Sequence, residues 1–240
     1  MTGYRVGHFF ADHGVESEVL ATVGTVYRFT IDPRPNEFVA ETYQVDLMEE
    51  TPSVKVDLGL FHPKCSKWSD MPNVDPNDHE NQIPRAREIA ETVATDYVIE
   101  NKPRAPLRDP VVLNGRMFGL PLAYERAFEA TFPIKAPVRQ QTLADKTVSP
   151  YFYSDRSTEW WRAVKGYTGD YPKQHLAKNA LPAAYVQTIV RSWLEATDVR
   201  DGTVPQDNNG RAPRRAAENQ ARLGDGGRIL VADVGGESDG

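Results

Sequence analysis

The sequence predicts an α/β fold in which helices flank a mostly parallel sheet. Residues 54–61 form a β-rich run that stops at His62-Pro63, because proline cannot donate to a sheet ladder. Apolar side chains then recur at helical spacing over residues 83–96, and residues 97–99 begin another strand. A strand, a helix and a strand in this order predict a right-handed crossover between two parallel strands.

The carboxyl ends of parallel strands lie at one edge of their sheet, where open α/β folds bind ligands. Cys65 follows the first predicted strand and Glu100 follows the second, so a thiol and a carboxylate are expected at the same crevice. A lone cysteine is more often a buried apolar residue. Here its neighbours Lys64 and Lys67 do not suit a core, and a nearby ammonium favours the reactive thiolate.

The composition of the 240-residue chain indicates one domain, or one domain plus an appendage. A single cysteine excludes an intramolecular disulfide framework and a four-cysteine zinc site, which suggests a reducing compartment. The first residues lack the pattern of a signal peptide, and no apolar run approaches the length of a membrane span. We expect a monomeric cytoplasmic protein with no membrane partner.

Charge is unevenly distributed along the chain. The formal net charge of −6 divides into −10 for residues 1–100, +6 for residues 101–197 and −2 for residues 198–240. The net-positive segment at residues 101–197 means that a negative net charge does not exclude polyanion binding, because binding depends on local positive surface over the phosphates. Residues 198–240 hold 8 of the 17 glycines and no aromatic residue, so we expect a mostly disordered tail with a candidate strand at residues 228–232.

Several segments occur in an order that is specific when they are taken together. They are Pro63-Lys64-Cys65, Glu100-Asn101-Lys102, Met117-Phe118-Gly119-Leu120 and Tyr124-Glu125-Arg126-Ala127-Phe128-Glu129, followed by Trp160-Trp161-Arg162-Ala163 and residues 178–185. This order resembles the DNA (cytosine-5-)methyltransferases, above all the compact forms carried by phages and archaeal viruses. The resemblance covers residues 4–195 and is strongest over residues 57–132.

The resemblance implies the Rossmann-like fold of the S-adenosylmethionine-dependent methyltransferases. It places a catalytic and cofactor-binding part at residues 1–134 and a very short target-recognition insertion at residues 135–158. Residues 159–197 would return to the catalytic part, and the tail at residues 198–240 would follow. The implied partners are DNA and a cognate restriction endonuclease, and the implied location for a virus or prophage protein is the host cytoplasm.

The resemblance also implies a chemistry. In this family a cysteine thiolate adds to carbon 6 of a flipped-out cytosine, which activates carbon 5 for methylation. Cys65 is assigned as the nucleophile, and Glu100 is assigned to the Watson–Crick edge of the base. Glu100 is expected to hold or share a proton near ring nitrogen 3, because a dry pocket raises its pKa. Arg126 is expected to orient the base carbonyl or Glu100.

The family's cofactor site begins with a Phe-x-Gly-x-Gly turn, for which this sequence has residues 10–14. The expected contacts with S-adenosylmethionine are Phe10, Gly14, Asp32, Asp46, Pro63, Asn179 and Ala180. Asp32 is assigned to the ribose hydroxyls, although alignment on the following proline puts Thr30 there. Asp46 is assigned to the adenine amino group, and solvated loop acids remain the alternative for both carboxylates.

Basic side chains of the middle segment are the expected contacts with phosphates. The assigned DNA-binding residues are Lys64, Lys67, Asn101, Lys102, Arg104, Arg116, Lys135 and Arg139, with Arg108 and Lys146 as further basic residues. Trp68, beside the cysteine loop, is a candidate for base stacking.

Four positions depart from the family pattern. Asp12 replaces a glycine, Lys64 replaces the second proline of Pro-Pro-Cys, Lys102 replaces a valine and Tyr124 replaces the first arginine of Arg-x-Arg. Two alternatives therefore stay open. One is a catalytically degenerate relative that binds DNA or protein, and the other is an RNA cytosine methyltransferase.

The histidines show no paired ligand spacing. A zinc site built from His62, Cys65 and His79 lacks a convincing fourth ligand, so no metal is predicted. No phosphate-cradling Gly-Lys-Ser/Thr loop occurs, which argues against nucleotide hydrolysis.

Overall fold

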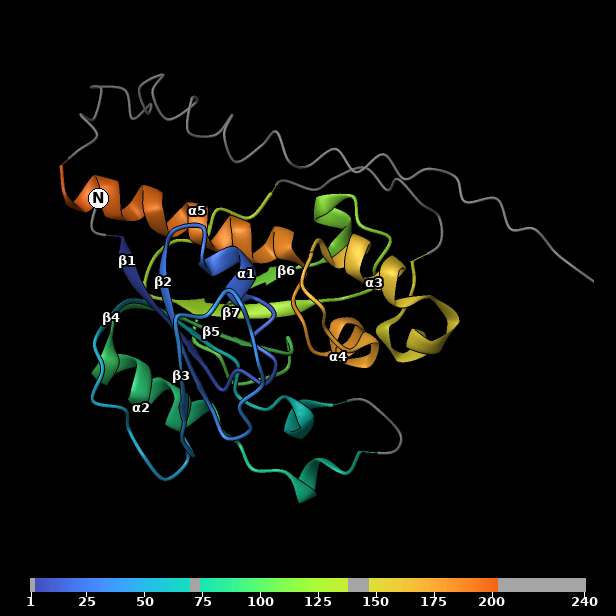
Figure 1. The fold of residues 1–240 in the computed structure, drawn as a ribbon, viewed down its shortest axis with the longest axis horizontal. Helices are drawn as coiled ribbons and strands as arrows, with labels where there is room; N and C mark the ends of the chain where they lie inside the picture. The colour runs from blue at the N-terminus through green and yellow to red at the C-terminus, as the bar shows by residue number, and fades with distance from the viewer. Residues whose placement is uncertain (1–2, 70–73, 138–146, 203–240) are drawn as a thin grey trace, which may run out of the picture. The chain divides into compact units, whose positions relative to one another are not determined.

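A computed structural model describes residues 3–69, 74–137 and 147–202 of the chain. Within these residues the strands form one seven-stranded sheet in the order β3-β2-β1-β4-β5-β7-β6 (Figure 1). The strands are β1 (Tyr4–Phe9), β2 (Gly24–Thr30), β3 (Glu41–Gln44), β4 (Val56–Phe61), β5 (Ala94–Asn101), β6 (Val111–Leu113) and β7 (Arg126–Ala130). The pairs from β3 to β5 are parallel, whereas β7 is antiparallel to β5 and β6. The expected mostly parallel sheet is confirmed.

Helices lie on both faces of this sheet (Figure 1). The α-helices are α1 (Ser17–Leu20), α2 (Ile83–Val93), α3 (Thr158–Lys165), α4 (Lys173–Lys178) and α5 (Ala183–Arg200), and the 3₁₀ helices are η1 (Ser66–Trp68), η2 (Pro76–Asp78), η3 (Gly115–Phe118) and η4 (Pro150–Asp155). α2 covers one face against β4 and β5, while α1 and the first part of α5 lie on the other side. In the described ranges, no helix combines the length and apolarity needed to cross a membrane.

The predicted crossover is formed by β4, α2 and β5, and its two strands are parallel as expected. α2 begins at Ile83, whose backbone N–H donates to the Asn81 side chain (3.2 Å). The helix ends at Val93 rather than at the expected residue 96, because Ala94 is already extended and begins β5.

Stacked aromatic rings fill the face that α2 covers. The ring centroid of Phe9 lies 4.5 Å from that of Phe29 and 4.3 Å from that of Phe61, and Tyr43 lies 4.9 Å from Phe29. The rings are nearly parallel, because paired positions on neighbouring strands present side chains to the same face. They pack with the apolar side of α2, which consists of Ala86, Ile89, Ala90 and Val93.

Side chains one position away on these strands point to the opposite face. On β1, Phe9 packs in the α2 core and His8 faces away from it. On β5, Ile99 packs in that core and Glu100 faces away. His62 directly follows β4 and lies on the same side as His8 and Glu100. The alternation therefore gathers polar side chains at the carboxyl edge, on the face opposite α2.

The contacts of the chain divide it into two units, Met1–Leu194 and Glu195–Gly240. The first unit holds the whole described sheet. In the second unit, α5 continues to Arg200, which is past the expected boundary at residue 197. The tail expected from residue 198, with its candidate strand, lies outside the described residues from residue 203 onward.

The predicted target-recognition insertion at residues 135–158 is only partly described. Residues 138–146 lie outside the described ranges. The following residues return to the body of the fold, because Val148 forms a bridge with Leu122 and η4 comes directly after it.

Candidate functional site

Three neighbouring strands end side by side at the candidate site. β1, β4 and β5 are parallel, and the His62 backbone N–H extends the ladder by donating to the Phe9 carbonyl (3.0 Å). The residues that follow each strand therefore lie at one edge of the sheet. This edge carries Cys65 after β4 and Glu100 near the end of β5, as the predicted crossover requires.

Cys65 lies in a loop that hydrogen bonds hold in place. Its carbonyl accepts a hydrogen bond from the Trp68 N–H (3.0 Å) in η1, and the residue is partly exposed. Asn101 Nδ2 donates to the Pro63 carbonyl (3.0 Å), and Asn101 Oδ1 accepts from the Lys102 N–H (2.9 Å). Asn101 is fully buried, so it holds the cysteine loop in place. The prediction that Asn101 contacts DNA is corrected accordingly.

Glu100 is a buried carboxylate that contacts a histidine and an arginine. His62 Nδ1 donates to Glu100 Oε2 (3.1 Å), and Arg126 Nε lies 3.2 Å from Glu100 Oε1. Burial would raise the pKa of Glu100, but Arg126 and then His62 outweigh burial, so the pKa lies below its ordinary value. Burial would likewise lower the pKa of His62, but Glu16 and Glu100 reverse that direction. In the free protein these neighbours therefore favour the ionised form of Glu100, whereas the expected proton near ring nitrogen 3 concerns the pocket with the base bound and stays a prediction.

Three buried atoms of this ion pair have no hydrogen-bond partner among the described residues, namely Glu100 Oε1, Arg126 Nε and Arg126 Nη1. Glu100 Oε1 is an acceptor and faces Arg126 Nε, while Arg126 Nη1 is a further donor. The third guanidinium nitrogen of Arg126, Nη2, donates to the Tyr124 hydroxyl (2.8 Å) and holds the side chain in place. The wall formed by Glu100 and Arg126 therefore suits a ligand edge that presents one donor and one acceptor.

Tyr124 occupies the position where the family pattern has an arginine. Its hydroxyl donates to the Lys178 carbonyl (3.1 Å) and accepts from Arg126 Nη2. The Lys165 ammonium lies 3.6 Å from the centroid of the Tyr124 ring. Burial, followed by repulsion from Arg126, holds the pKa of Lys165 well below its ordinary value. The tyrosine thus ties Arg126 to the end of α4 without adding a second cation to the site.

Three adjoining cavities surround the cysteine loop. The first, which we call the inner cavity, has a volume of about 210 Å³. Its lining includes all three predicted catalytic residues and most of the predicted cofactor residues, namely Cys65, Glu100, Arg126, Phe10, Gly14, Pro63 and Asn179. Gly14 has φ +64°, and a Cβ there would lie 2.7 Å from Arg28 Cδ, so glycine is required.

The side cavity, of about 380 Å³, shares Phe10 with the inner cavity and contains Thr30 and Asp46. The outer cavity, of about 560 Å³, shares Cys65 and Arg126 with the inner one and is lined by Trp68, Lys102 and Arg104. Cys65 and Arg126 therefore lie where the inner and outer cavities meet.

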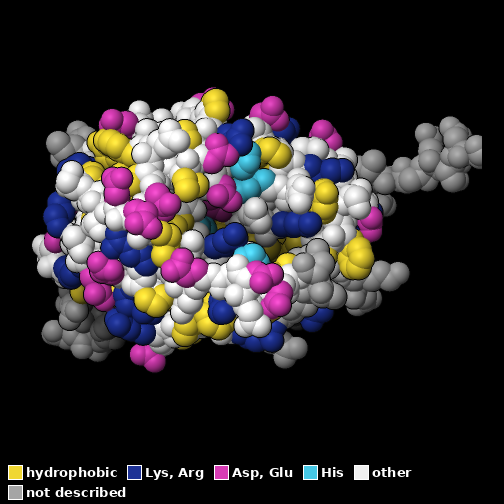
Figure 2. Space-filling view, turned by 90° about the horizontal axis from the view of Figure 1, so that it is seen from below, with side chains coloured by type: hydrophobic (Ala, Val, Ile, Leu, Met, Phe, Trp, Pro, Cys, Tyr) yellow, Lys and Arg dark blue, Asp and Glu magenta, His cyan; other side chains and the backbone are white. Residues whose placement is uncertain are grey.

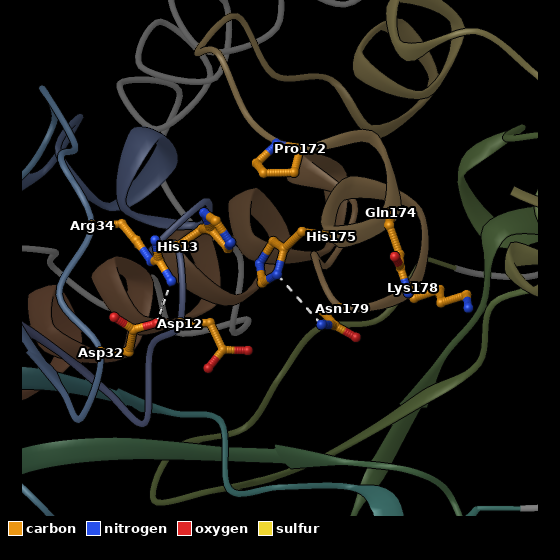
Figure 3. Close-up of a pocket in the computed structure, with 9 residues that line it drawn as sticks. All are labelled: Asp12, His13, Asp32, Arg34, Pro172, Gln174, His175, Lys178 and Asn179. Atoms are coloured by element: carbon orange, nitrogen blue, oxygen red, sulfur yellow. Dashed lines mark hydrogen bonds and ion pairs between the residues drawn. The ribbon is translucent and has the colours of Figure 1, made fainter. Parts of the chain in front are cut away.

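Two predicted cofactor residues lie outside these three cavities. Asp32 is mostly exposed and pairs with Arg34 (2.5 Å) in a surface cavity beside His175 (Figure 3). Thr30, the alternative for its role, lies in the side cavity. Ala180 is fully buried, and its carbonyl accepts a hydrogen bond from Lys165 Nζ.

The predicted DNA-binding residues are spread over the described surface. Lys102 and Arg104 line the outer cavity, whereas Lys64 lines the inner and side cavities. Lys67 lies in η1, and Arg116 lies in η3 just beyond the end of β6. Figure 2 shows acidic and basic side chains interspersed, with no face-wide patch of one sign. Positive charge at the site is therefore local.

Lys135 lies at the wrong edge for a contact beside Cys65. β7 runs antiparallel to β5, so the chain after Ala130 approaches the amino end of β5. There Thr131 Oγ1 donates to Asp96 (2.9 Å), and the Lys135 N–H donates to Ser192 on α5 (2.9 Å). Arg139 and Lys146 lie outside the described residues, and Arg108 pairs with Glu91 (3.3 Å).

Sequence reasoning missed a group of histidines around the inner cavity. His8, His62 and His175 all line it, and the ring of His175 faces that of His13 with centroids 4.3 Å apart (Figure 3). Burial, then His13 and His62, lowers the pKa of His175 to about 3. The sequence signal that could have revealed this group is the position of His8 and His62, each at the end of a strand in a neighbouring parallel pair.

Neither the protein-family models nor the curated proteins compared with this sequence gave a match. Among solved structures, the chain is similar to the Entamoeba histolytica methyltransferase EhMeth. That similarity has a TM-score of 0.55 and 11% identity, and it covers 82% of this chain and 99% of the other. The S. pombe Dnmt2 methyltransferase gives 0.51 and 10%, over 81% of this chain and 99% of that one. This chain has the Rossmann-like methyltransferase fold.

The chain also aligns in part with an E. coli protein described as a DNA modification methyltransferase encoded within a prophage. Its TM-score is 0.44 with 13% identity, and the match covers 62% of this chain and 54% of that chain. The chain thus spans about half the length of the prophage protein.

Proposed function

We propose that this protein transfers a methyl group from S-adenosylmethionine to carbon 5 of cytosine in DNA. The observation that carries the proposal is the convergence of Cys65, Glu100 and Arg126 on one cavity, although they lie on three separate segments of the chain. Cys65 and Arg126 lie where the inner and outer cavities meet, which leaves room for a cofactor on one side of Cys65 and for a base on the other.

The inner and side cavities fit the cofactor. The side cavity combines the Asp46 carboxylate and the Thr30 hydroxyl with apolar walls from Ile31, Val45, Leu47 and Met48. These groups match an adenosine, because a carboxylate can accept from an amino group, a hydroxyl can bond the ribose and apolar walls can hold the base. The methionine part would extend past Phe10 and Gly14 into the inner cavity, beside Cys65.

The residues then have distinct roles. When bound, S-adenosylmethionine supplies an electrophilic methyl group. The Cys65 thiolate forms a bond to carbon 6 of cytosine, and the electron pair of the ring double bond makes carbon 5 nucleophilic. Arg126 Nη1 donates to the base carbonyl, where negative charge develops, and Glu100 Oε1 accepts from the base amino group. Carbon 5 would then bond to the methyl group as the methyl–sulfur bond of the cofactor breaks, which leaves S-adenosylhomocysteine. A water molecule would take the carbon-5 proton, and the electrons of that C–H bond would restore the ring double bond as the thiolate leaves carbon 6.

The outer cavity is the proposed entrance for the base. Lys102 and Arg104 would hold the phosphates on either side of a flipped nucleotide, and Trp68 and Tyr151 offer aromatic rings at its wall. RNA could use the same contacts. The deciding experiment is transfer of tritiated methyl groups to DNA and RNA of matched sequence, offered together. Preferential labelling of DNA supports the proposal, and preferential labelling of RNA would replace it with the RNA alternative.

Binding of the cofactor separates the enzymatic proposal from a degenerate relative. Asp12, which lines both the inner and the side cavity, is the departure that favours degeneracy. Calorimetric titration with S-adenosylmethionine should show saturable binding with one site per chain. Lack of binding, together with retained DNA binding, would support a non-enzymatic DNA-binding protein.

Replacement of Asp46 tests the cofactor placement. Asp46 Oδ1 accepts from the Met48 N–H (2.9 Å), and Asp46→Asn can keep that bond while removing the charge. Loss of one hydrogen bond to a charged group should weaken S-adenosylmethionine binding about tenfold or more. Asp32→Asn is the matched control and should leave the Kd unchanged. A larger effect of Asp32→Asn than of Asp46→Asn in the same titration would reverse the assignment.

Neutralising Lys102 and Arg104 tests the nucleic-acid entrance. The double variant Lys102→Gln/Arg104→Gln should weaken DNA binding and reduce the slope of log K against log salt by about 2, because each phosphate contact contributes about 0.9. Lys55→Gln removes a cation just before β4, at the opposite edge of the sheet, and should leave the slope unchanged. Equal effects of the two variants would argue against this entrance.

A further inference from the structure

Three potential metal-binding side chains meet at the buried end of the inner cavity. They are His8 near the end of β1, Glu16 just before α1 and His62 just after β4. One ligand atom from each lies within 4.8 Å of the others, and His8 Nε2 is 3.6 Å from Glu16 Oε2. Neither the proposed methyl transfer nor the proposed cofactor contacts use these atoms.

Each of the three side chains is fixed through one polar atom, which leaves the other for a shared ligand. His8 Nδ1 pairs with Ser17 Oγ (2.9 Å), and His62 Nδ1 donates to Glu100 Oε2 (3.1 Å). Glu16 Oε1 accepts from the Leu181 N–H (2.7 Å). Metal-binding histidines are held in this way, with one ring nitrogen on the metal and the other on a hydroxyl, carbonyl or carboxylate.

The remaining ring nitrogens are buried without a protein partner. His8 is fully buried, and both His8 Nε2 and His62 Nε2 have no hydrogen-bond partner among the described residues. Orphaned buried polar atoms are rare in folded proteins, and each calls for a specific reason. An imidazolium at His62 would balance the charge of Glu16, but His8 Nε2 would stay 3.6 Å from Glu16 Oε2, which is beyond hydrogen-bond distance. A cation shared by both rings and the carboxylate accounts for both orphaned nitrogens.

We propose that His8 Nε2, His62 Nε2 and Glu16 Oε2 together bind one divalent transition-metal ion of the zinc class. Two imidazoles and one carboxylate suit zinc, cobalt, nickel or iron rather than magnesium or calcium, which prefer oxygen ligands. Bonds of about 2.0 to 2.2 Å would place the ligand atoms about 3.3 Å apart, so a modest closing of the cluster suffices. All three residues line the inner cavity, so a fourth ligand would come from that cavity.

Bound metal would also position Glu100. With Nε2 on the metal, His62 must carry its proton on Nδ1, where it donates to Glu100 Oε2. The ion would thereby fix the side chain that faces Arg126. The metal site stands independently of the proposed methyl transfer, because its test needs neither cofactor nor nucleic acid.

The test is titration of the full chain, freed of metal by a chelator, with Co²⁺ alone. We expect one Co²⁺ per chain and the visible absorption of a four-coordinate cobalt ion, which Zn²⁺ then abolishes by displacement. His8→Gln, His62→Gln and Glu16→Gln should each weaken Co²⁺ binding by about a hundredfold or more, because each removes one of three protein ligands. Glu16→Gln can still accept from the Leu181 N–H and therefore retains that structural contact.

His79→Gln is the matched control, because His79 lies in the loop after η2, outside the cluster. It should bind Co²⁺ as the wild type does. Binding that survives all three cluster substitutions, or that His79→Gln abolishes, would overturn the proposal. A thiolate-to-cobalt charge-transfer band lost in Cys65→Ser would overturn this ligand set. Thermal melting without metal identifies any variant that fails to fold, and the remaining two cluster variants then decide.

Discussion

Cys65→Ala should abolish methyl transfer while leaving S-adenosylmethionine binding unchanged. Cytosine carbon 5 is a poor nucleophile until a thiolate has added to carbon 6, so removing the thiolate removes the activation step itself. We expect the rate of tritiated methyl transfer to fall by on the order of 10⁴ or more, the scale seen when a covalent nucleophile is removed. Calorimetry on the same variant should return a Kd near that of the wild type, because the adenosine contacts lie in the side cavity, which Cys65 does not line. Beside the methionine part, in the inner cavity, the substitution removes only one sulfur atom.

A chemical trap gives a second, independent readout for Cys65. DNA containing 5-fluorocytosine should become covalently attached to the wild-type protein in the presence of cofactor. The thiolate can leave only after carbon 5 loses a proton, and a carbon 5 that carries fluorine has no proton to lose, so the adduct persists. The adduct should be absent with Cys65→Ala and should depend on Glu100 and Arg126 through their contacts with the base. Methyl transfer by Cys65→Ala at a rate near that of wild type would refute covalent catalysis.

The crossover at the centre of the fold was predictable because its signals are local. The apolar spacing of α2, the β-rich run of β4 and the proline after it each act within a few residues. Parallel pairing then follows because a crossover helix returns the chain to the end of the sheet where the first strand began. For this reason the meeting of Cys65 and Glu100 at one edge could be inferred from sequence. The end of α2 at Val93 could not be inferred, because helical spacing does not show where β5 begins to pair.

Contacts that depend on register and long-range packing were not predictable. His8 and Glu16 belong to one polar cluster with His62 only because β1 lies beside β4, whose paired residues come 52 positions later in the sequence. The ionisation of Glu100 depends on Arg126, which arrives on β7 from the opposite direction. Burial alone pointed to a protonated Glu100, and the nearby guanidinium reverses that direction.

The positions of the basic residues were predicted least well. A lysine or arginine in a net-positive segment does not show which edge of the sheet it will reach. Lys102 and Lys135 look equivalent in a net-positive segment, yet they lie at opposite edges of the sheet. Asn101 belongs to the most recognisable motif, but its side chain is turned inward to hold the Pro63 carbonyl. A motif therefore locates a loop more reliably than it assigns the direction of each side chain.

Glu129→Gln should be the most destabilising charge substitution in the sheet. Glu129 on β7 is buried and receives two hydrogen bonds of 2.7 Å from Arg87 Nε and Nη2, with a third of 2.8 Å from the Arg108 N–H. The substitution leaves the partly buried Arg87 guanidinium without its counter-ion, which should cost about 3 kcal/mol, the lower end of the range for a broken buried pair. Urea unfolding should report this loss at pH 7. Glu91→Gln breaks an exposed pair with Arg108 and should cost about 1 kcal/mol or less.

The destabilisation by Glu129→Gln should itself depend on pH. Burial would raise the pKa of Glu129, but the hydrogen bonds from Arg87 and Arg108 outweigh burial and hold the pKa below the ordinary value of 4.5. A folded-state pKa below the unfolded value means that the stability from this carboxylate is fully present above pH 4.5 and is lost as the pH falls through the folded value. The gap in unfolding free energy between wild type and Glu129→Gln should therefore be constant from pH 7 to about pH 5 and shrink below pH 4.5. A gap that stays constant throughout acid titration would mean that packing around residue 129, rather than the charge of its carboxylate, stabilises β7.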